Sequence, residues 1–231
     1  MVGPGAAAVG ALDEIARRLR RDCPWDREQD ARSIVSHTVE EAYELADAAY
    51  SGDDAKLLDE LGDVLFQVHF LALMLEERGS GDLAAVAEHC VAKLVRRHPH
   101  VFGQVEVDGA ADVLRNWDQI KRGEEGRGEG IFGELPDNLP SPIYARKVQR
   151  RAAGAGRPAF VPGEPLERLE REAARLGSGE LSREQGFEAL GELLFAAVGA
   201  ARELEIDPEL ALRAAADRLR RRTEAEEAKG A

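Results

Sequence analysis

Aromatic and β-branched residues are scarce in this sequence. Only 5% of its 231 residues are Phe, Trp or Tyr, and runs of β-branched residues are nearly absent. β-Sheets are built largely from these residue types, whereas the Ala, Leu, Glu and Arg that dominate this chain favour helices. The composition therefore excludes a sheet-rich fold and predicts an all-α protein of one or two domains.

Excess basic charge and clustered cysteines are also missing. The net charge of −13 argues against general nucleic-acid binding, because a phosphate backbone is bound through basic side chains. Cys23 and Cys90 lie far apart and form no C-x-x-C pair. Neither a disulfide framework nor a zinc site is indicated, so we expect a reducing, cytoplasmic location.

The chain has no apolar run long enough to cross a membrane. Its most apolar stretch, residues 64–75, is shorter than a bilayer is thick and contains Gln67 and His69. Residues 1–11 are small and apolar but lack the basic start of a signal peptide. We expect no membrane partner, a flexible extension over residues 1–11 and a buried helix over residues 64–75.

A helical hairpin is predicted between residues 33 and 77. Apolar residues recur at helical spacing from about Ser33 to Tyr50, and a second helical pattern continues to about Glu77. The residues Ser51-Gly52-Asp53 form the turn, with Asp53 or Asp54 available to cap the second helix. Because the connection is short, the two helices must pack antiparallel.

Five of the carboxylates in this hairpin form two clusters, with three acids before the turn and two after it: Glu40, Glu41 and Glu44, then Glu60 and Asp63. Spacings of three or four residues place the members of each cluster on one helical face. The antiparallel hairpin brings the two clusters to similar heights. Carboxylates held that close repel unless a hard cation such as Mg²⁺ or Mn²⁺ neutralises them, so the sequence predicts a metal site.

Three other interpretations of the acids are open. A solvated helix face would pair them with Lys or Arg one turn downstream, but Glu40, Glu41 and Glu44 have no such partner. A di-iron carboxylate bundle would need Glu-x-x-His pairs, which neither Glu41 nor Glu60 provides. A protein that only dimerises could use apolar side chains of the second helix, and these suit a core equally well: Phe66, Phe70 and Leu73.

Two pairs of residues further along the chain share helical faces. Lys93 and Arg97 are four residues apart near the end of a predicted helix, where cations also complement the helix dipole. Trp117 and Lys121 have the same spacing on a helix that ends near Arg122. Residues 123–142 are rich in Gly, Pro and acid, which predicts a linker and a domain boundary.

The hairpin is repeated in the C-terminal part of the chain. Residues 59–66, DELGDVLF, match residues 188–195, EALGELLF. The apolar positions persist, but Glu60 becomes Ala189, Asp63 becomes Glu192, and Arg171 and Arg175 are expected where the first cluster has acids. We therefore predict a helical bundle built from a duplicated hairpin, with a structural second copy.

Further short motifs accompany the acids, in the order Cys23-Pro24-Trp25-Asp26, ELGDVLFQV at residues 60–68, RRHPHVF at residues 96–102 and Trp117-Asp118-Gln119-Ile120-Lys121. Two acidic motifs complete the set: EExxE is Glu40-Glu41-Ala42-Tyr43-Glu44, and ExxD is Glu60-Leu61-Gly62-Asp63. With these motifs in order, the sequence resembles MazG-type nucleoside triphosphate pyrophosphohydrolases, a branch of the all-α NTP pyrophosphohydrolases. The strong match covers about residues 12–122, and a weaker one covers the rest.

The resemblance implies Mg²⁺-dependent hydrolysis of an NTP or dNTP to the monophosphate and pyrophosphate, with Mn²⁺ as a possible substitute, in a helical homodimer that serves nucleotide-pool housekeeping or stress. The metal ligands it implies are Glu41, Glu44, Glu60 and Asp63. The catalytic residues that it implies are Glu40, Glu41 and Glu60. Glu40 either binds the metal, lies just outside the metal ligands or helps to orient water. The residues that hold phosphates and the nucleoside are Lys93, Arg97, Trp117 and Lys121.

The C-terminal copy of the hairpin departs from the family pattern. Family members often carry their better catalytic domain there, but this copy has lost its acids and a second W-x-x-x-K segment. We therefore assign residues 1–11 to an extension, 12–122 to the catalytic domain, 123–142 to a linker and 143–231 to a degenerate second domain. The alternative function is a catalytically weak dimerisation or interaction protein that retains a metal and nucleotide site.

Overall fold

The computed structural model describes residues 3–123, 130–136 and 138–230, and every regular element within these ranges is a helix. This confirms the prediction of an all-α protein. The chain divides into two compact units, which we call unit 1 (Met1–Val105) and unit 2 (Glu106–Ala231). None of the helices in the described ranges combines the length and the apolar character that a membrane span requires.

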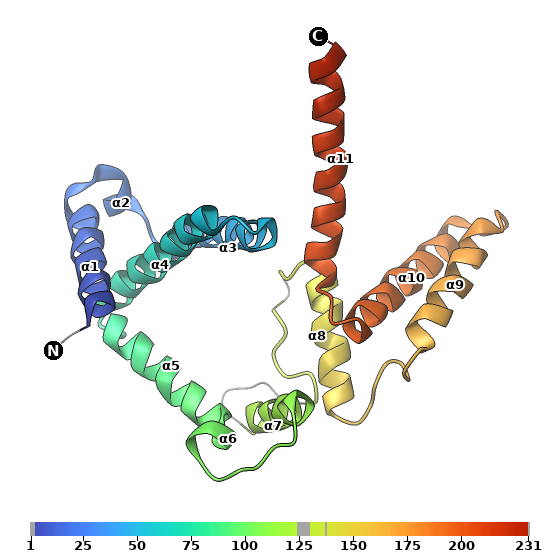
Figure 1. Cartoon of the computed structure of the whole chain (residues 1–231), viewed down its shortest axis with the longest axis horizontal. Helices are drawn as coiled ribbons and strands as arrows, with labels where there is room; N and C mark the ends of the chain where they lie inside the picture. Colours follow the sequence, from blue (N-terminus) through green and yellow to red (C-terminus); the bar gives the residue numbers. More distant parts are fainter. Residues whose placement is uncertain (1–2, 124–129, 137, 231) are drawn as a thin grey trace. The chain divides into compact units, whose positions relative to one another are not determined.

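Unit 1 contains six of the helices in Figure 1: α1 (Pro4–Asp22), α2 (Pro24–Glu28), α3 (Ala31–Ser51), α4 (Asp54–Glu77), α5 (Leu83–Arg97) and α6 (Pro99–Phe102). Helix α1 includes most of the segment that the sequence predicts as a flexible extension, residues 1–11, of which residues 1 and 2 lie outside the described ranges. It begins at Pro4, because proline is well tolerated in the first helical turn and the alanines that follow are strong helix formers.

The predicted antiparallel hairpin is formed by α3 and α4. The Asp30 carboxylate accepts hydrogen bonds from the backbone N–H groups of Arg32 and Ser33, which starts α3 two residues earlier than the apolar pattern indicates. Gly52 ends this helix with a φ of 71°, a left-handed conformation that glycine adopts without strain. Asp53 then caps α4 by accepting from two backbone N–H groups of its first turn.

The C-terminal half of α4 forms the core of unit 1. Phe70 is fully buried and packs with Ile34 of α3 and with Met74 one turn further along α4. Phe66 is partly buried against this cluster, and Leu73 is buried. The apolar residues that could have served either a core or a dimer interface therefore belong to the core of the chain itself.

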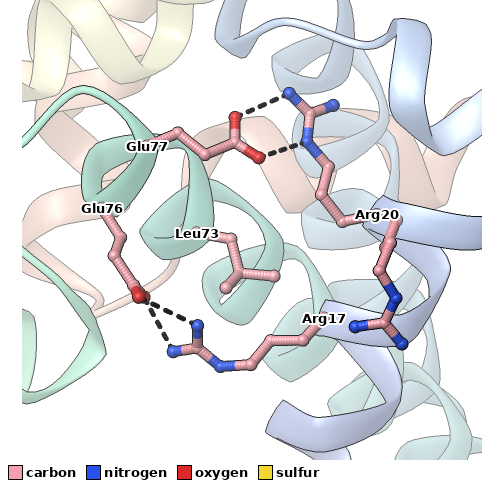
Figure 2. A pocket seen from close by; sticks show the side chains of 6 residues that line it. Arg17, Arg20, Leu73, Glu76 and Glu77 are labelled. Carbon is pink, nitrogen blue, oxygen red and sulfur yellow. Dashed lines mark hydrogen bonds and ion pairs between the residues drawn. The ribbon is translucent and has the colours of Figure 1, made fainter.

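Two arginines of α1 fasten it to the end of α4 (Figure 2). Arg17 donates two hydrogen bonds to the Glu76 carboxylate at 3.0 and 2.7 Å, and Arg20 donates two to Glu77 at 2.7 and 2.8 Å. Arg20 also donates to the backbone carbonyls of Asp26 and Gln29, which fixes α2 and the start of α3. The arginine side chains, the two glutamates and Leu73 line a hollow of about 460 Å³.

Unit 2 contains the remaining described helices: α7 (Ala110–Arg122), α8 (Ser141–Gly154), α9 (Glu164–Gly177), α10 (Arg183–Glu203) and α11 (Pro208–Gly230). The division between the units differs from the boundary predicted at residues 123–142, because α7 packs against α8 and falls in unit 2. Residues 124–129 and 137 of that predicted linker lie outside the described ranges.

The repeated hairpin of unit 2 is formed by α9 and α10, and α8 packs across α10. Gln149 of α8 is fully buried and donates a hydrogen bond to the Phe195 carbonyl at 2.8 Å. The Phe160 and Phe195 rings lie 5.6 Å apart, close to Gly199 of α10. A Cβ atom at Gly199 would meet the Phe160 ring at 2.9 Å and Pro165 at 3.2 Å, so the packing here requires glycine.

Two glycines of α10 are expected to respond oppositely to alanine. Gly199→Ala must displace the Phe160 ring and should lower the free energy of unfolding by about 1–3 kcal/mol. Gly191→Ala meets no atom within 4 Å and should raise it by up to about 1 kcal/mol, because alanine favours helix. Thermal and urea unfolding followed by circular dichroism would test the pair. Equal effects of the two substitutions would contradict the packing described for Gly199.

The bond between Arg20 and Glu77 should make stability depend on pH. Hydrogen bonding from Arg20 lowers the pKa of Glu77 below its ordinary 4.5. A lowered acid pKa means that the stabilisation is fully present above pH 4.5 and is lost as the pH falls through the folded-state pKa. Glu77→Gln should therefore lower the unfolding temperature at pH 7. The free energy of unfolding should fall by less than about 1 kcal/mol, because the pair is partly exposed.

Unfolding temperatures of the wild type and this variant should converge at acidic pH. Glu14→Gln, at an exposed position of α1, is the matched control and should change little at either pH. A difference between wild type and Glu77→Gln that persists unchanged in acid would rule out the ionised carboxylate as its source.

Candidate metal centre

Three of the predicted carboxylates come together in the α3–α4 hairpin. Glu41 of α3 and Glu60 and Asp63 of α4 each offer one oxygen atom, and these three atoms all lie within 4.8 Å of one another. The tight turn at Gly52 creates this arrangement, because Glu41 precedes the turn by as many residues as Asp63 follows it. We call Glu41, Glu60 and Asp63 the carboxylate triad.

The triad is electrostatically strained in the absence of a cation. Glu60 is only 9% exposed, and burial followed by the charge of Glu44 raises its pKa, with Asp63 adding to the effect. Burial also raises the pKa of Glu41, and the charges of Asp63 and Glu44 raise it further. Both shifts mean that the ionised forms are disfavoured here, which a bound cation would reverse.

Two further predicted acids lie beside the triad. Glu44 is exposed and falls outside the close group, but its charge acts on both Glu41 and Glu60. Glu40 is exposed, and its carboxylate lies 3.8 Å from the His37 ring nitrogen Nδ1, an ion pair when the histidine is protonated. The hairpin therefore surrounds the triad with additional negative charge.

The triad has the chemistry that a hard divalent cation requires. All three residues offer carboxylate oxygens, which are the ligands that Mg²⁺ and Mn²⁺ prefer, and no sulfur or imidazole ligand belongs to the described group. Glu60 and Asp63 are one helical turn apart and Glu41 faces them from the other helix. The residues present thus fit such an ion.

Lys56 is a neighbour of the triad that the motif reasoning missed. It lies one turn before Glu60 on α4, and its charge acts against the rise of the Glu60 pKa. Lys56, Asp59, Gly62 and Asp63 line a hollow of about 550 Å³ on the surface of α4. The i, i+4 spacing of Lys56 and Glu60 is the sequence signal that could have identified it.

The predicted substrate-binding residues occupy two other helices. Lys93 and Arg97 are half-buried in the C-terminal part of α5 in unit 1. Trp117 and Lys121 lie in α7 of unit 2, where the Lys121 ammonium group is 4.6 Å from the centre of the Trp117 ring. The structure brings the second pair together, as the four-residue spacing predicts.

The corresponding part of the second hairpin is neutralised by arginine. Ala189, in the place of Glu60, is fully buried. Glu192, in the place of Asp63, accepts a hydrogen bond from Arg168 Nη2 at 3.0 Å, and Arg168 Nε lies 3.4 Å from an oxygen of the buried Glu172. One guanidinium group thus lies between two carboxylates.

The sequence comparison of the two hairpins named Arg171 and Arg175 but did not identify Arg168. Arg171 and Arg175 were expected in the positions of the acids, and both do lie near the repeat's remaining carboxylate, at 3.8 and 3.3 Å from Glu172. Arg168 alone bridges Glu172 of α9 and Glu192 of α10. Because Glu172 and Glu192 already have a cation from the chain, they need no metal ion to offset their charge.

Comparisons with known proteins agree on one family. A family model described as the MazG nucleotide pyrophosphohydrolase domain matches residues 29–102. The nucleoside triphosphate pyrophosphohydrolase of Escherichia coli K12 is 36% identical over 223 residues, which cover 93% of this chain and 85% of that protein. The nucleoside triphosphate pyrophosphohydrolase/pyrophosphatase MazG of Thermotoga maritima is 37% identical over 207 residues, or 88% and 79% of the two chains.

A solved structure gives a partial alignment as well. The crystal structure of a mazG-related protein from Thermotoga maritima aligns with 49% of this chain and 98% of its own, with 26% identity and a TM-score of 0.43. The stretch matched by the family model includes all of the α3–α4 hairpin and therefore the carboxylate triad. The chain belongs to the MazG nucleotide pyrophosphohydrolase family.

Proposed function

We propose that this protein hydrolyses nucleoside triphosphates, of the ribo or deoxyribo series, to the monophosphate and pyrophosphate with the help of Mg²⁺. The observation that carries the proposal is the carboxylate triad, whose oxygens lie within 4.8 Å of one another in the hairpin that the family model matches. Curated relatives named for this activity, at 36–37% identity over most of the chain, support it.

Glu41, Glu60 and Asp63 would hold the cation, and Glu44 would add negative charge beside them. When bound, the ion would polarise phosphate oxygens and lower the pKa of a coordinated water molecule. Glu60 is largely buried, which limits the positions that its carboxylate can take. Glu40 is exposed beside Glu41, where its carboxylate can orient the attacking water and accept its proton.

A chain with a net charge of −13 needs local cations to hold a polyphosphate. Lys93, Arg97 and Lys121 would bind the phosphates and offset the charge that develops on the leaving pyrophosphate. Trp117 would stack on the nucleoside through the flat face of its ring. In this proposal the acids bind the metal ion, and the cations and Trp117 bind the substrate.

Assembly into a homodimer belongs to the same proposal. Three leucines on one face of α4 are exposed in the single chain, Leu58 (74%), Leu61 (49%) and Leu65 (39%). Leucine side chains at this spacing form a stripe that a second copy of the hairpin could cover. A cytoplasmic role in nucleotide-pool housekeeping or stress fits the same activity.

A second function, as an interaction protein with little catalysis, would use the same stripe. It is favoured by the exposure of these leucines and by the intact packing of the second hairpin, which has no carboxylate triad. A pyrophosphate-release assay with and without Mg²⁺ separates the two functions, because only the enzyme gives metal-dependent release.

Removal of one triad carboxylate should abolish hydrolysis. Glu60→Ala is expected to reduce Mg²⁺-dependent pyrophosphate release by at least about a thousandfold for every NTP and dNTP tested, with the helical content unchanged. Glu192→Ala changes the corresponding position of unit 2 and should retain activity within about twofold of the wild type. Substantial Mg²⁺-dependent release by Glu60→Ala would defeat the proposal of a single metal site.

The same carboxylate should oppose stability when no metal is present. Because burial and neighbouring charges raise the pKa of Glu60, Glu60→Gln should raise the unfolding temperature of the metal-free protein at neutral pH. The wild type should gain stability when Mg²⁺ is added after chelation, and the variant should gain much less. Differential scanning calorimetry with and without Mg²⁺ measures both effects.

Glu14→Gln provides the control, since it removes an exposed carboxylate of α1. Its response to Mg²⁺ should equal that of the wild type. A Glu60→Gln variant that is less stable than the metal-free wild type would show that Glu60 serves packing rather than metal binding.

A further inference from the structure

Arg150 of α8 has an aromatic ring, but no carboxylate, as a described contact of its guanidinium group. Its side chain is half-buried, and its guanidinium carbon lies 5.8 Å from the centre of the Trp117 ring in α7. Within the part of the chain that the structure describes, it makes no hydrogen bond and no ion pair. A guanidinium group carries five N–H donors, so removing part of it from water without an acceptor costs free energy.

The neighbouring arginines of α8 are engaged in structural contacts. Arg146 pairs with Asp207 before α11, and Arg151 donates to the Glu134 carbonyl at 3.0 Å. Arg150 differs from both because its described interaction is with an aromatic ring. Arg150 is therefore the arginine of this helix whose guanidinium group has an aromatic ring, and no oxygen atom, as its described neighbour.

The surroundings of Arg150 are positively charged. The Lys121 ammonium group lies 4.6 Å from the centre of the same Trp117 ring. Residues 141–154, which form α8, include four Lys or Arg and no Asp or Glu, although the whole chain has a net charge of −13.

An aromatic face flanked by cations suits a nucleotide. The flat base can stack on Trp117, and phosphate oxygens can accept two parallel hydrogen bonds from a guanidinium fork. We propose that Arg150 binds the phosphate chain of the nucleoside triphosphate next to Trp117 and Lys121, as a further substrate-binding residue. The choice of ligand rests on the proposed function. On binding, the guanidinium group exchanges the ring for phosphate oxygens.

Trp117 is a built-in probe for this contact. The chain has two tryptophans, so Trp25→Phe leaves Trp117 as the sole indole fluorophore. Titration of this parent with ATP in the presence of EDTA should change the Trp117 emission. Arg150→Met should raise the Kd for ATP by about tenfold or more, as expected for the loss of a charged hydrogen bond, and Arg150→Lys should recover part of the affinity.

Two controls separate phosphate binding from a change in folding or stacking. Arg157→Met removes an exposed arginine just beyond α8 and should leave the Kd unchanged. Tripolyphosphate should compete with ATP in the parent, and its competition should weaken in Arg150→Met. Binding of adenosine, which has no phosphate, should be the same in both. Equal ATP affinity of the parent and Arg150→Met would overturn the proposal.

Steady-state kinetics with Mg²⁺ supplies an independent readout. Arg150→Met should raise KM about tenfold while kcat stays within about twofold of the wild type, because the residue would bind substrate and is not one of the triad carboxylates. An unchanged KM would overturn the proposal. If the protein hydrolysed no nucleotide at all, the proposed function would fail, yet the Arg150-dependent response of Trp117 to ATP would still establish the binding residue.

Discussion

The α3–α4 hairpin holds carboxylates of Glu41, Glu60 and Asp63 so close that their oxygens could share one cation. Burial, and then the charges of neighbouring acids, raise the pKa values of Glu41 and Glu60. The fold tolerates this cost because the same helices pack a core around Phe70 further along the hairpin. The acids lie toward the turn and the apolar residues toward the other end of the hairpin. Stability and chemistry are thus provided by different ends of one element.

Unit 2 shows how the same hairpin dispenses with an external cation. Arg168 lies between Glu172 and Glu192, and Ala189 fills the place of the buried Glu60. A guanidinium group that forms ion pairs with two carboxylates offsets the repulsion that the triad retains. Comparison of the two hairpins separates the residues that packing needs from those that a metal ion needs, within a single chain.

Much of unit 1 follows from local signals in the sequence. Gly52 and Asp53 are turn and capping residues, and the structure uses each of them where its chemistry predicts, whereas the Asp30 cap starts α3 two residues before the apolar pattern does. In unit 2, the four-residue spacing of Trp117 and Lys121 likewise predicts their contact. These features depend on neighbours within one or two helical turns, which is why the sequence is sufficient to predict them.

The sequence by itself determined the all-α class, the hairpin and the acids that line it, because helix propensity, turn chemistry and periodicity are local properties. Tertiary structure alone decided which acids form the close triad, that Arg20 ties α2 to α4, that Arg168 rather than Arg171 bridges the second hairpin, and that Arg150 faces Trp117. Each of these depends on how separate helices pack against one another, and helical periodicity does not encode which side chains meet across such an interface.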